Sequence, residues 1–323
     1  MSKDIRYSIV IPVYNEEALL EQTYRRIKQV LTMTGEPYEL IFVNDGSSDR
    51  SVNLIKGFCD RDESVKLISF SRNFGHQVAI TAGMDYAAGA AVVVIDADLQ
   101  DPPELILKMI AKWKEGYEVV YAKRNQRKGE TFFKKQTAHL FYRLLRASTD
   151  IDIPVDTGDF RLIDRKVCDA LKQLPEKNRY VRGLVSWVGF RQTAVEYDRD
   201  PRQAGESKYP LKKMIKLCLD GLTSFSIKPI KLASYAGVLL IALGLAYLAL
   251  LVFSKLLGSA VVISGWNLVL ASELVLTGFL LTMMGIMGEY IGRIYDEARN
   301  RPLYIVGESY RKDEKERNVM KIG

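Results

Sequence analysis

The amino-acid sequence predicts an α/β fold. We expect a domain built on a Rossmann-like, mostly parallel sheet, followed by an amphipathic interface helix and two transmembrane helices. Three features of the 323-residue chain lead to this prediction. Apolar strand-like runs alternate with helical segments in the first half, two closely spaced carboxylates follow one of these runs, and two long apolar runs lie in the last third.

Short apolar runs predict strands at residues 7–13, 38–44, 65–70, 91–95 and 118–122. Helical patterns separate them, at residues 17–33, 50–59, 77–87 and 103–114. Strands that alternate with helices of about 10 to 15 residues are typical of βαβ units, whose strands run parallel. The carboxyl ends of such strands share one edge of the sheet, where ligands bind in open α/β folds.

The most informative stretch is residues 91–104, AVVVIDADLQDPPE, in which an apolar run ends in Asp96 and Asp98. Positions i and i+2 of a strand share a face, so both carboxylates can reach one point at its carboxyl end. Two hard oxygen ligands suit Mg²⁺ or Mn²⁺ that carries a diphosphate. An Asp-x-Asp is also common in surface turns, but its place between a buried strand and the helix opened by Pro102 and Pro103 favours a metal site.

Polar loops also follow the first two predicted strands. Their sequences are Tyr14-Asn15-Glu16 and Asp45-Gly46-Ser47-Ser48-Asp49. Taken singly, the second loop is an ordinary turn with a helix N-cap. Together with the two carboxylates, the loops bring polar groups to one sheet edge, as a nucleotide site requires.

Two apolar runs, residues 232–253 and 266–288, are long enough to be transmembrane helices. At about 1.5 Å per residue, the first reaches roughly 33 Å and can cross a bilayer core. The second is interrupted only by Glu273, which we expect to face protein or water because a charge is costly in hydrocarbon. A buried hairpin in a soluble protein is the alternative, and these lengths disfavour it.

Basic residues flank the two runs, whereas the only charge between them is Lys255. The positive-inside rule then places both termini and the α/β domain in the cytoplasm. With no signal peptide in the sequence, we expect a multi-pass protein of the inner (cytoplasmic) membrane. The expected organisation is a catalytic domain at 1–210, an amphipathic interface helix at 211–228, a helical hairpin at 229–292 and a cytoplasmic tail at 293–323.

Composition agrees with a membrane-associated protein. The net charge of +7 could indicate nucleic-acid binding, but the excess basic residues lie mostly beside the apolar runs, where anionic lipid head groups account for them. The three cysteines are dispersed, which predicts a reducing compartment and no cysteine metal cage. His76 and His139 are isolated and are expected to be structural or surface residues.

Seven motifs carry a family resemblance: IPVYNEE, NDGSSD, SRNFG, IDADLQDPPE, TGDFRLIDR, RQAGESKY and MGEYIGRIYDEARNRP. In these motifs the chain resembles the inverting family-2 glycosyltransferases of GT-A fold. The similarity runs along almost the whole chain and is closest to the polyprenyl-phosphate branch. That branch holds the bactoprenol (undecaprenyl-phosphate) glucosyltransferases, with the dolichyl-phosphate mannose synthases and the undecaprenyl-phosphate aminoarabinose transferases as relatives.

The resemblance implies a site for a nucleotide-sugar donor, formed by Pro12, Tyr14, Glu16, Asp45, Asp96, Ala97, Asp98, Gln100, Arg124, Arg202 and Lys208. Within this set, Asp45 is expected to accept a hydrogen bond from the base, which suits a uracil N–H. Asp96, Asp98 and Gln100 are expected to surround Mg²⁺ or Mn²⁺. The metal and the three basic residues would stabilise the departing diphosphate, with the RQAGESKY loop closing as a lid.

The same resemblance marks Asp159, in TGDF, as the candidate catalytic carboxylate. Its role stays open between a general base, a group that orients acceptor or sugar, and a brace for the strand that follows. A phosphate monoester has a second pKa of about 6, so such an acceptor is already largely ionised at neutral pH. The need for a strong base is correspondingly smaller.

The implied reaction is transfer of a hexose, glucose by resemblance, from a UDP-sugar to undecaprenyl phosphate with inversion. Other donors of the same class are the alternatives: GlcNAc, galactose, aminoarabinose or GDP-mannose. A processive polysaccharide synthase fits less well because it usually needs more spans, and a non-catalytic scaffold would not need these carboxylates and cations together. The expected partners are the donor, the polyprenyl phosphate, the bilayer and, by resemblance, three further copies in a homotetramer; nucleic acid is not expected.

Overall fold

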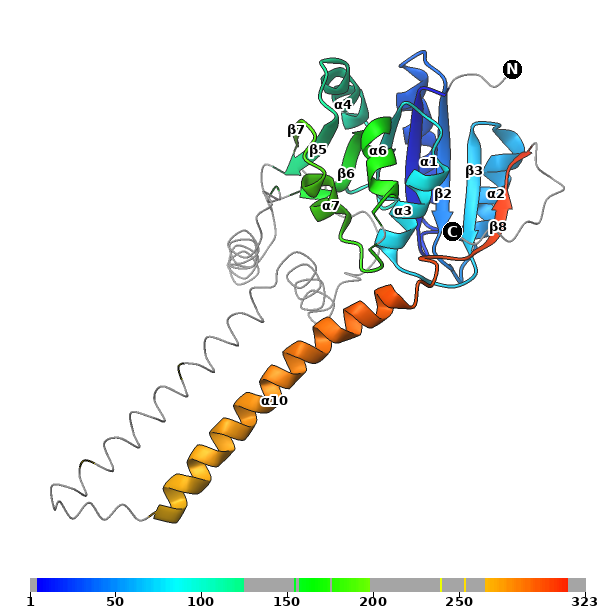
Figure 1. Cartoon of the computed structure of the whole chain (residues 1–323). Coiled ribbons are helices and arrows are strands. Elements are labelled where there is room, and N and C mark those ends of the chain that lie inside the picture. Colours follow the sequence, from blue (N-terminus) through cyan, green and yellow to red (C-terminus); the bar gives the residue numbers. More distant parts are fainter. Residues whose placement is uncertain are drawn as a thin grey trace. The chain divides into compact units, whose positions relative to one another are not determined.

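The computed structural model describes residues 5–124, 157–174, 176–197 and 265–312, together with the isolated positions Pro154, Leu239 and Phe253. The chain divides into two compact units (Figure 1). The larger comprises Met1–Cys218 and Arg301–Gly323, and the smaller comprises Leu219–Asn300. The predicted interface helix and the RQAGESKY loop lie outside the described residues.

Within the described part of the larger unit, eight strands form one sheet in the order β7-β5-β6-β4-β1-β2-β3-β8 (Figure 1). They are β1 (Tyr7–Val13), β2 (Tyr38–Asn44), β3 (Val65–Phe70), β4 (Ala91–Val94), β5 (Val119–Arg124), β6 (Thr157–Asp164), β7 (Gln192–Tyr197) and β8 (Val306–Tyr310). Of these, β6 and β8 run opposite to the rest. The predicted α/β fold with a mostly parallel sheet is confirmed.

Helices cover both faces of this sheet (Figure 1). One face packs on α1 (Leu20–Thr32), α2 (Ser51–Arg61) and α4 (Leu105–Lys114), and the other on α3 (His76–Tyr86) and α6 (Arg165–Lys172), with α7 (Val181–Trp187) against α6. Alternate residues of β1 divide between the faces: Ile9 and Ile11 join the core beneath α1 and α2, whereas Val10 meets α3. A Cβ at Gly83 would lie 2.0 Å from Cγ1 of Val10, so only glycine lets α3 approach the sheet this closely.

The first three strands have the predicted bounds, and all the helices predicted in the first half are present with ends shifted by a few residues. The structure also contains a strand that the sequence did not predict. β8 comes from residues expected to form part of a tail, and it pairs antiparallel with β3. The chain therefore returns to the edge of the sheet after the second unit.

The smaller unit contains α10 (Gly265–Ala298), which includes the second predicted span. The first predicted span, 232–253, lies outside the described residues except for Leu239 and Phe253. Of the helices in the described ranges, none has the combination of length and hydropathy needed to cross a membrane.

Candidate active site

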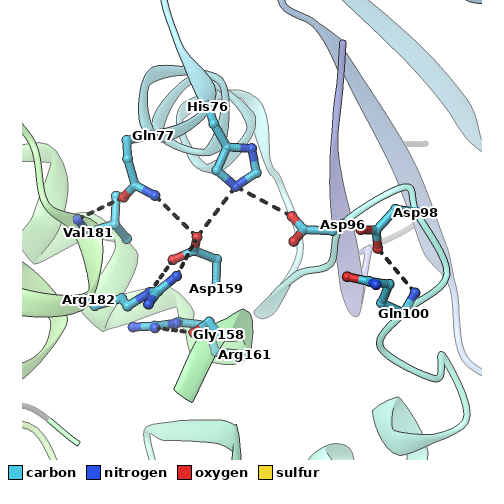
Figure 2. Close-up of polar contacts among 10 residues, drawn as sticks. All are labelled: His76, Gln77, Asp96, Asp98, Gln100, Gly158, Asp159, Arg161, Val181 and Arg182. Atoms are coloured by element: carbon cyan, nitrogen blue, oxygen red, sulfur yellow. Dashed lines mark hydrogen bonds and ion pairs between the residues drawn. The ribbon is translucent and has the colours of Figure 1, made fainter. Parts of the chain in front are cut away.

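The Asp-x-Asp loop leaves the carboxyl end of β4, in the middle of the sheet. Its backbone is anchored because the Thr23 hydroxyl donates a 2.8 Å hydrogen bond to the carbonyl of Ala97, which is itself buried. Oδ1 of Asp98 accepts a 3.1 Å hydrogen bond from the backbone N–H of Gln100, and Figure 2 shows the Gln100 side chain beside this carboxylate. Asp96, Asp98 and Gln100 thus all belong to this one loop, and their assignment as metal ligands stays a prediction.

Asp159 lies across from this loop because of the strand register. β6 runs antiparallel to β4, with Arg161 opposite Val94. Two residues further along, the same register places Asp159 beside Asp96, beyond the end of β4. The antiparallel strand therefore carries the candidate catalytic carboxylate to the edge where the parallel strands end.

Four hydrogen bonds and ion pairs hold the Asp159 carboxylate (Figure 2). Arg182 donates from Nε to Oδ1 at 2.8 Å and from Nη2 to Oδ2 at 3.1 Å, and Gln77 donates from Nε2 to Oδ2 at 3.2 Å. Nε2 of His76 lies 3.4 Å from the same Oδ2. Burial raises the pKa of Asp159, but Arg182 and His76 lower it more strongly and hold it well below its ordinary value. The group is therefore a carboxylate with little basicity.

His76 links the two acidic groups. Its Nε2 lies 3.4 Å from Oδ1 of Asp96 as well as 3.4 Å from Oδ2 of Asp159, and its side chain is 34% exposed. Burial lowers the pKa of His76, but the two carboxylates outweigh this effect and raise the pKa to about 9. The expectation that His76 is isolated was therefore wrong; His139 lies outside the described residues.

Two further contributors, Gln77 and Arg182, were also missed by sequence reasoning. Gln77 follows His76 at the start of α3, and its Oε1 accepts a 3.1 Å hydrogen bond from the backbone N–H of Val181. It thereby joins α3 to α7, which carries Arg182. One signal could have found His76 and Gln77: they follow SRNFG directly, where the loop after a parallel strand leads into α3.

The residues assigned to the nucleoside lie at the ends of β1 and β2. Pro12 is buried within β1, and Tyr14, which follows the strand, is 43% exposed. Asn15 has a left-handed φ of 53°, and its Oδ1 accepts a 2.8 Å hydrogen bond from the backbone N–H of Ser48. The backbone N–H of Glu16 donates to Ser51 Oγ at 3.1 Å. The YNEE and NDGSSD loops are therefore bound to each other.

Asp45 is buried and faces the SRNFG loop. Its Oδ1 accepts hydrogen bonds from the backbone N–H groups of Phe74 at 2.7 Å and Gly75 at 3.1 Å, and Gly75 also reaches Oδ2 at 3.0 Å. Burial raises the pKa of Asp45, while these backbone hydrogen bonds oppose the rise. A carboxylate has about four acceptor positions, so Asp45 keeps capacity for a further donor.

Of the three cations assigned to the donor site by resemblance, the structure describes only the backbone of Arg124. Arg124 is the last residue of β5, whose carboxyl end lies at the same edge of the sheet. Arg202 and Lys208 lie outside the described residues. Arg182 and His76 are thus the basic groups that the structure places against Asp159.

The donor set fits a hard divalent cation. Oδ1 of Asp96 is buried and makes no hydrogen bond within the described part of the chain, although Nε2 of His76 lies 3.4 Å away. Burial, opposed by His76, raises the pKa of this carboxyl to about 6. A cation would relieve that cost. Across the ranges that the structure covers, no three or more His, Cys, Asp or Glu side chains gather as a metal cage. Mg²⁺ needs no such cage, because one or two carboxylates, water and substrate phosphates complete its shell.

Fold and site together define an α/β domain with opposed carboxylates at the carboxyl edge of its sheet. Residues 8–172 match the family model described as glycosyl transferase family 2. The chain is 65% identical over 310 residues to the uncharacterized glycosyltransferase YkcC of Bacillus subtilis, with 96% of each chain covered. It is 40% identical over 308 residues to the SfII prophage-derived bactoprenol glucosyl transferase of Shigella flexneri, covering 95% of this chain and 99% of that one.

The chain therefore belongs to glycosyltransferase family 2 and is a sugar-transferring enzyme. Among solved structures, glucosyl-3-phosphoglycerate synthase from Mycobacterium tuberculosis is 17% identical, with 68% of this chain and 78% of that chain covered and a TM-score of 0.47. A similarity this low adds nothing to the assignment.

Proposed function

We propose that this enzyme transfers a hexose, most readily glucose, from a UDP-sugar to undecaprenyl or another polyprenyl phosphate, with inversion at the anomeric carbon. The observation that carries the proposal is the opposition of Asp96 and Asp159 across the ends of β4 and β6, with His76 between them. The acceptor follows from the relatives, because similarity to bactoprenol glucosyl transferases extends over nearly the whole chain.

The donor site is the polar edge of β1, β2 and β4. The nucleoside lies against Pro12, Tyr14 and Glu16, and the remaining acceptor capacity of Asp45 takes the N–H of the base. The diphosphate lies at the loop of Asp96, Ala97 and Asp98. Helices follow the carboxyl ends of these strands, and the positive ends of their dipoles favour such an anion.

Asp96, Asp98 and Gln100 are the protein ligands for Mg²⁺ or Mn²⁺ in this proposal. When bound, the metal neutralises charge on the departing UDP. Arg124, with Arg202 and Lys208 from the lid loop, adds positive charge around the same leaving group. The buried Oδ1 of Asp96 supports this assignment, because within the described chain it makes no hydrogen bond and has the 3.4 Å ion-pair contact with His76 instead.

Asp159 acts by holding cations in place rather than by removing a proton. Its pKa lies well below the ordinary value because of Arg182 and His76, so it is a poor proton acceptor. The acceptor phosphate needs little help, since its second pKa of about 6 leaves it largely dianionic at neutral pH. In this role the carboxylate fixes the guanidinium of Arg182 and the imidazole of His76 toward the incoming anion.

The membrane assignment rests on the sequence. The apolar runs at 232–253 and 266–288 and the flanking basic residues support a cytoplasmic catalytic domain on a two-helix hairpin in the inner membrane. This arrangement holds the active site at the surface where a lipid-linked phosphate emerges. A homotetramer is the assembly that the resemblance supports.

A donor panel tests the proposal. The purified full chain is offered UDP-glucose, UDP-galactose, UDP-GlcNAc and GDP-mannose, each with undecaprenyl phosphate. A site that hydrogen-bonds particular hydroxyls discriminates strongly, so one clear favourite is expected, and it should be UDP-glucose. Preference for another donor would reject the glucose assignment, and polymeric product would favour a processive synthase.

A further inference from the structure

The segment that follows α10 docks beside the SRNFG loop. Asn300 has a left-handed φ of 46° and Pro302 follows it, so the helix ends here. The carbonyl of Ile305 then accepts a 3.0 Å hydrogen bond from the backbone N–H of Ser71, and Val306 pairs with Phe70 in the sheet. Residues 301–306 therefore lie against the end of β3, where the SRNFG loop begins.

Tyr304 is the central contact of this segment. Its ring is buried and stacks on Phe70 with centroids 5.2 Å apart, and Phe70 in turn meets Phe74 edge-on at 5.6 Å. Its hydroxyl donates a 3.1 Å hydrogen bond to Oδ2 of Asp85, near the end of α3. The SRNFG loop and α3 together form one connection, and Tyr304 contacts it at both ends, through Phe70 and through Asp85.

The connection that Tyr304 braces carries two parts of the site. The backbone N–H groups of Phe74 and Gly75 hold Asp45, the residue assigned to the base. The next residue, His76, contacts Asp96 and Asp159. A shift of this loop would therefore disturb the base site and the catalytic carboxylates together.

We propose that Tyr304 is a positioning residue for donor binding, which acts through Phe70 and Phe74 on the loop that holds Asp45. The inference rests on the proposed function, because it takes the Asp45 edge as the UDP site. The C-terminal segment then has two roles: Tyr304 supports the donor site, and β8 forms an edge strand of the sheet. Aromatic stacking and a partly buried hydrogen bond keep the loop in its binding arrangement before the donor arrives.

The test compares Tyr304→Ala with Tyr310→Ala in the full chain. Tyr310 is the control because it is a second tyrosine of the same C-terminal segment, at the end of β8, and donates a 2.8 Å hydrogen bond to Asp60, remote from the SRNFG loop. UDP affinity with Mg²⁺ is measured by calorimetry well below the melting temperature of each variant. Tyr304→Ala should weaken UDP binding by about tenfold, which corresponds to about 1.4 kcal/mol, and Tyr310→Ala by less than about twofold.

Phe70→Leu supplies a second variant should Tyr304→Ala fail to fold. It keeps an apolar side chain at that position and removes the ring that relays the contact, so UDP binding should again weaken. UDP affinity within about twofold of wild type in either Tyr304→Ala or Phe70→Leu, or equal losses in Tyr304→Ala and Tyr310→Ala, would reject the positioning role. A wild-type chain that binds no UDP would instead reject the proposed function.

Discussion

Arg182 forms a two-point ion pair with Asp159, with Nε–Oδ1 at 2.8 Å and Nη2–Oδ2 at 3.1 Å. Paired hydrogen bonds of this kind fix the orientation of both groups. The pair lies at the edge where the parallel strands end. Because Arg182 occupies both oxygens of Asp159, this carboxylate is paired with a cation and is not available as a general base. This arrangement suits an acceptor that is already an anion.

Asp159→Asn should lower turnover on the order of 100-fold while UDP still binds, because the amide cannot hold Arg182 and His76 through two charged contacts. Rates at saturating substrates and calorimetric UDP titration give the two quantities. The pKa of Asp159 is held low, so its ionisation should not limit the rate near neutral pH. The wild-type rate should instead rise at about pH 6, where the acceptor phosphate and the raised carboxyl of Asp96 both ionise.

Alkaline pH separates the possible roles of this residue. Loss of positioning should persist at pH 9 in Asp159→Asn. Recovery of the wild-type rate at that pH would show that Asp159 serves acceptor deprotonation. Wild-type turnover in Asp159→Ala at every pH would remove Asp159 from the mechanism.

Asp98→Asn should abolish most transfer, with a loss of about 100-fold or more, because one stabiliser of the leaving diphosphate is gone. EDTA should cause the same loss of transfer in the wild type, and added Mg²⁺ or Mn²⁺ should restore the activity. Asp169→Asn is the control, since this side chain is 53% exposed on α6 and contacts only Arg165 among the ion pairs of the described chain. Full activity in EDTA would overturn the metal assignment.

Gly83→Ala should destabilise the catalytic domain by about 1–3 kcal/mol, because the added Cβ would lie 2.0 Å from Val10 in the central strand. Urea unfolding followed by circular dichroism measures the change. Gly57→Ala in α2 is the matched control: its Cβ meets no atom within 4 Å, so it should stabilise by about 0.5–1 kcal/mol. Equal effects of the two substitutions would mean that the close approach of α3 to β1 is not required.

The parts of the fold that the sequence predicts well are local. β1, β2 and β3 are apolar runs flanked by polar loops, and their bounds follow from composition and spacing alone. The Asp-x-Asp loop is similarly local, since both carboxylates belong to one short stretch. The parallel order of these strands follows because helices connect them.

The missed residues depend on contacts between distant parts of the chain. His76 meets Asp159 only because β6 inserts antiparallel beside β4, a register that no local pattern encodes. Arg182 looks like an ordinary surface cation in the sequence, and only the folded chain shows that it pairs with Asp159 of β6. β8 is a short edge strand with few apolar residues, and its pairing with β3 depends on the return of the chain after α10.

The topology predicts that tags at both termini are protected from protease in intact cells, and that a cysteine placed near Ser259 reacts with an impermeant reagent from outside. The physical reason is that basic residues lie before the first apolar run and after the second, and such residues favour the cytoplasmic side. Permeabilised cells provide the control, because all three sites should then be accessible. External labelling of either terminus would contradict a cytoplasmic active site.

The central claim is that a UDP-linked sugar moves to a polyprenyl phosphate. It is tested by incubating the purified chain with radiolabelled UDP-glucose, Mg²⁺ and undecaprenyl phosphate, and then counting label extracted into organic solvent. We expect organic-phase label that requires the lipid phosphate and disappears in Asp98→Asn. Label that stays in water with the lipid phosphate present, or that becomes extractable without it, would contradict the account.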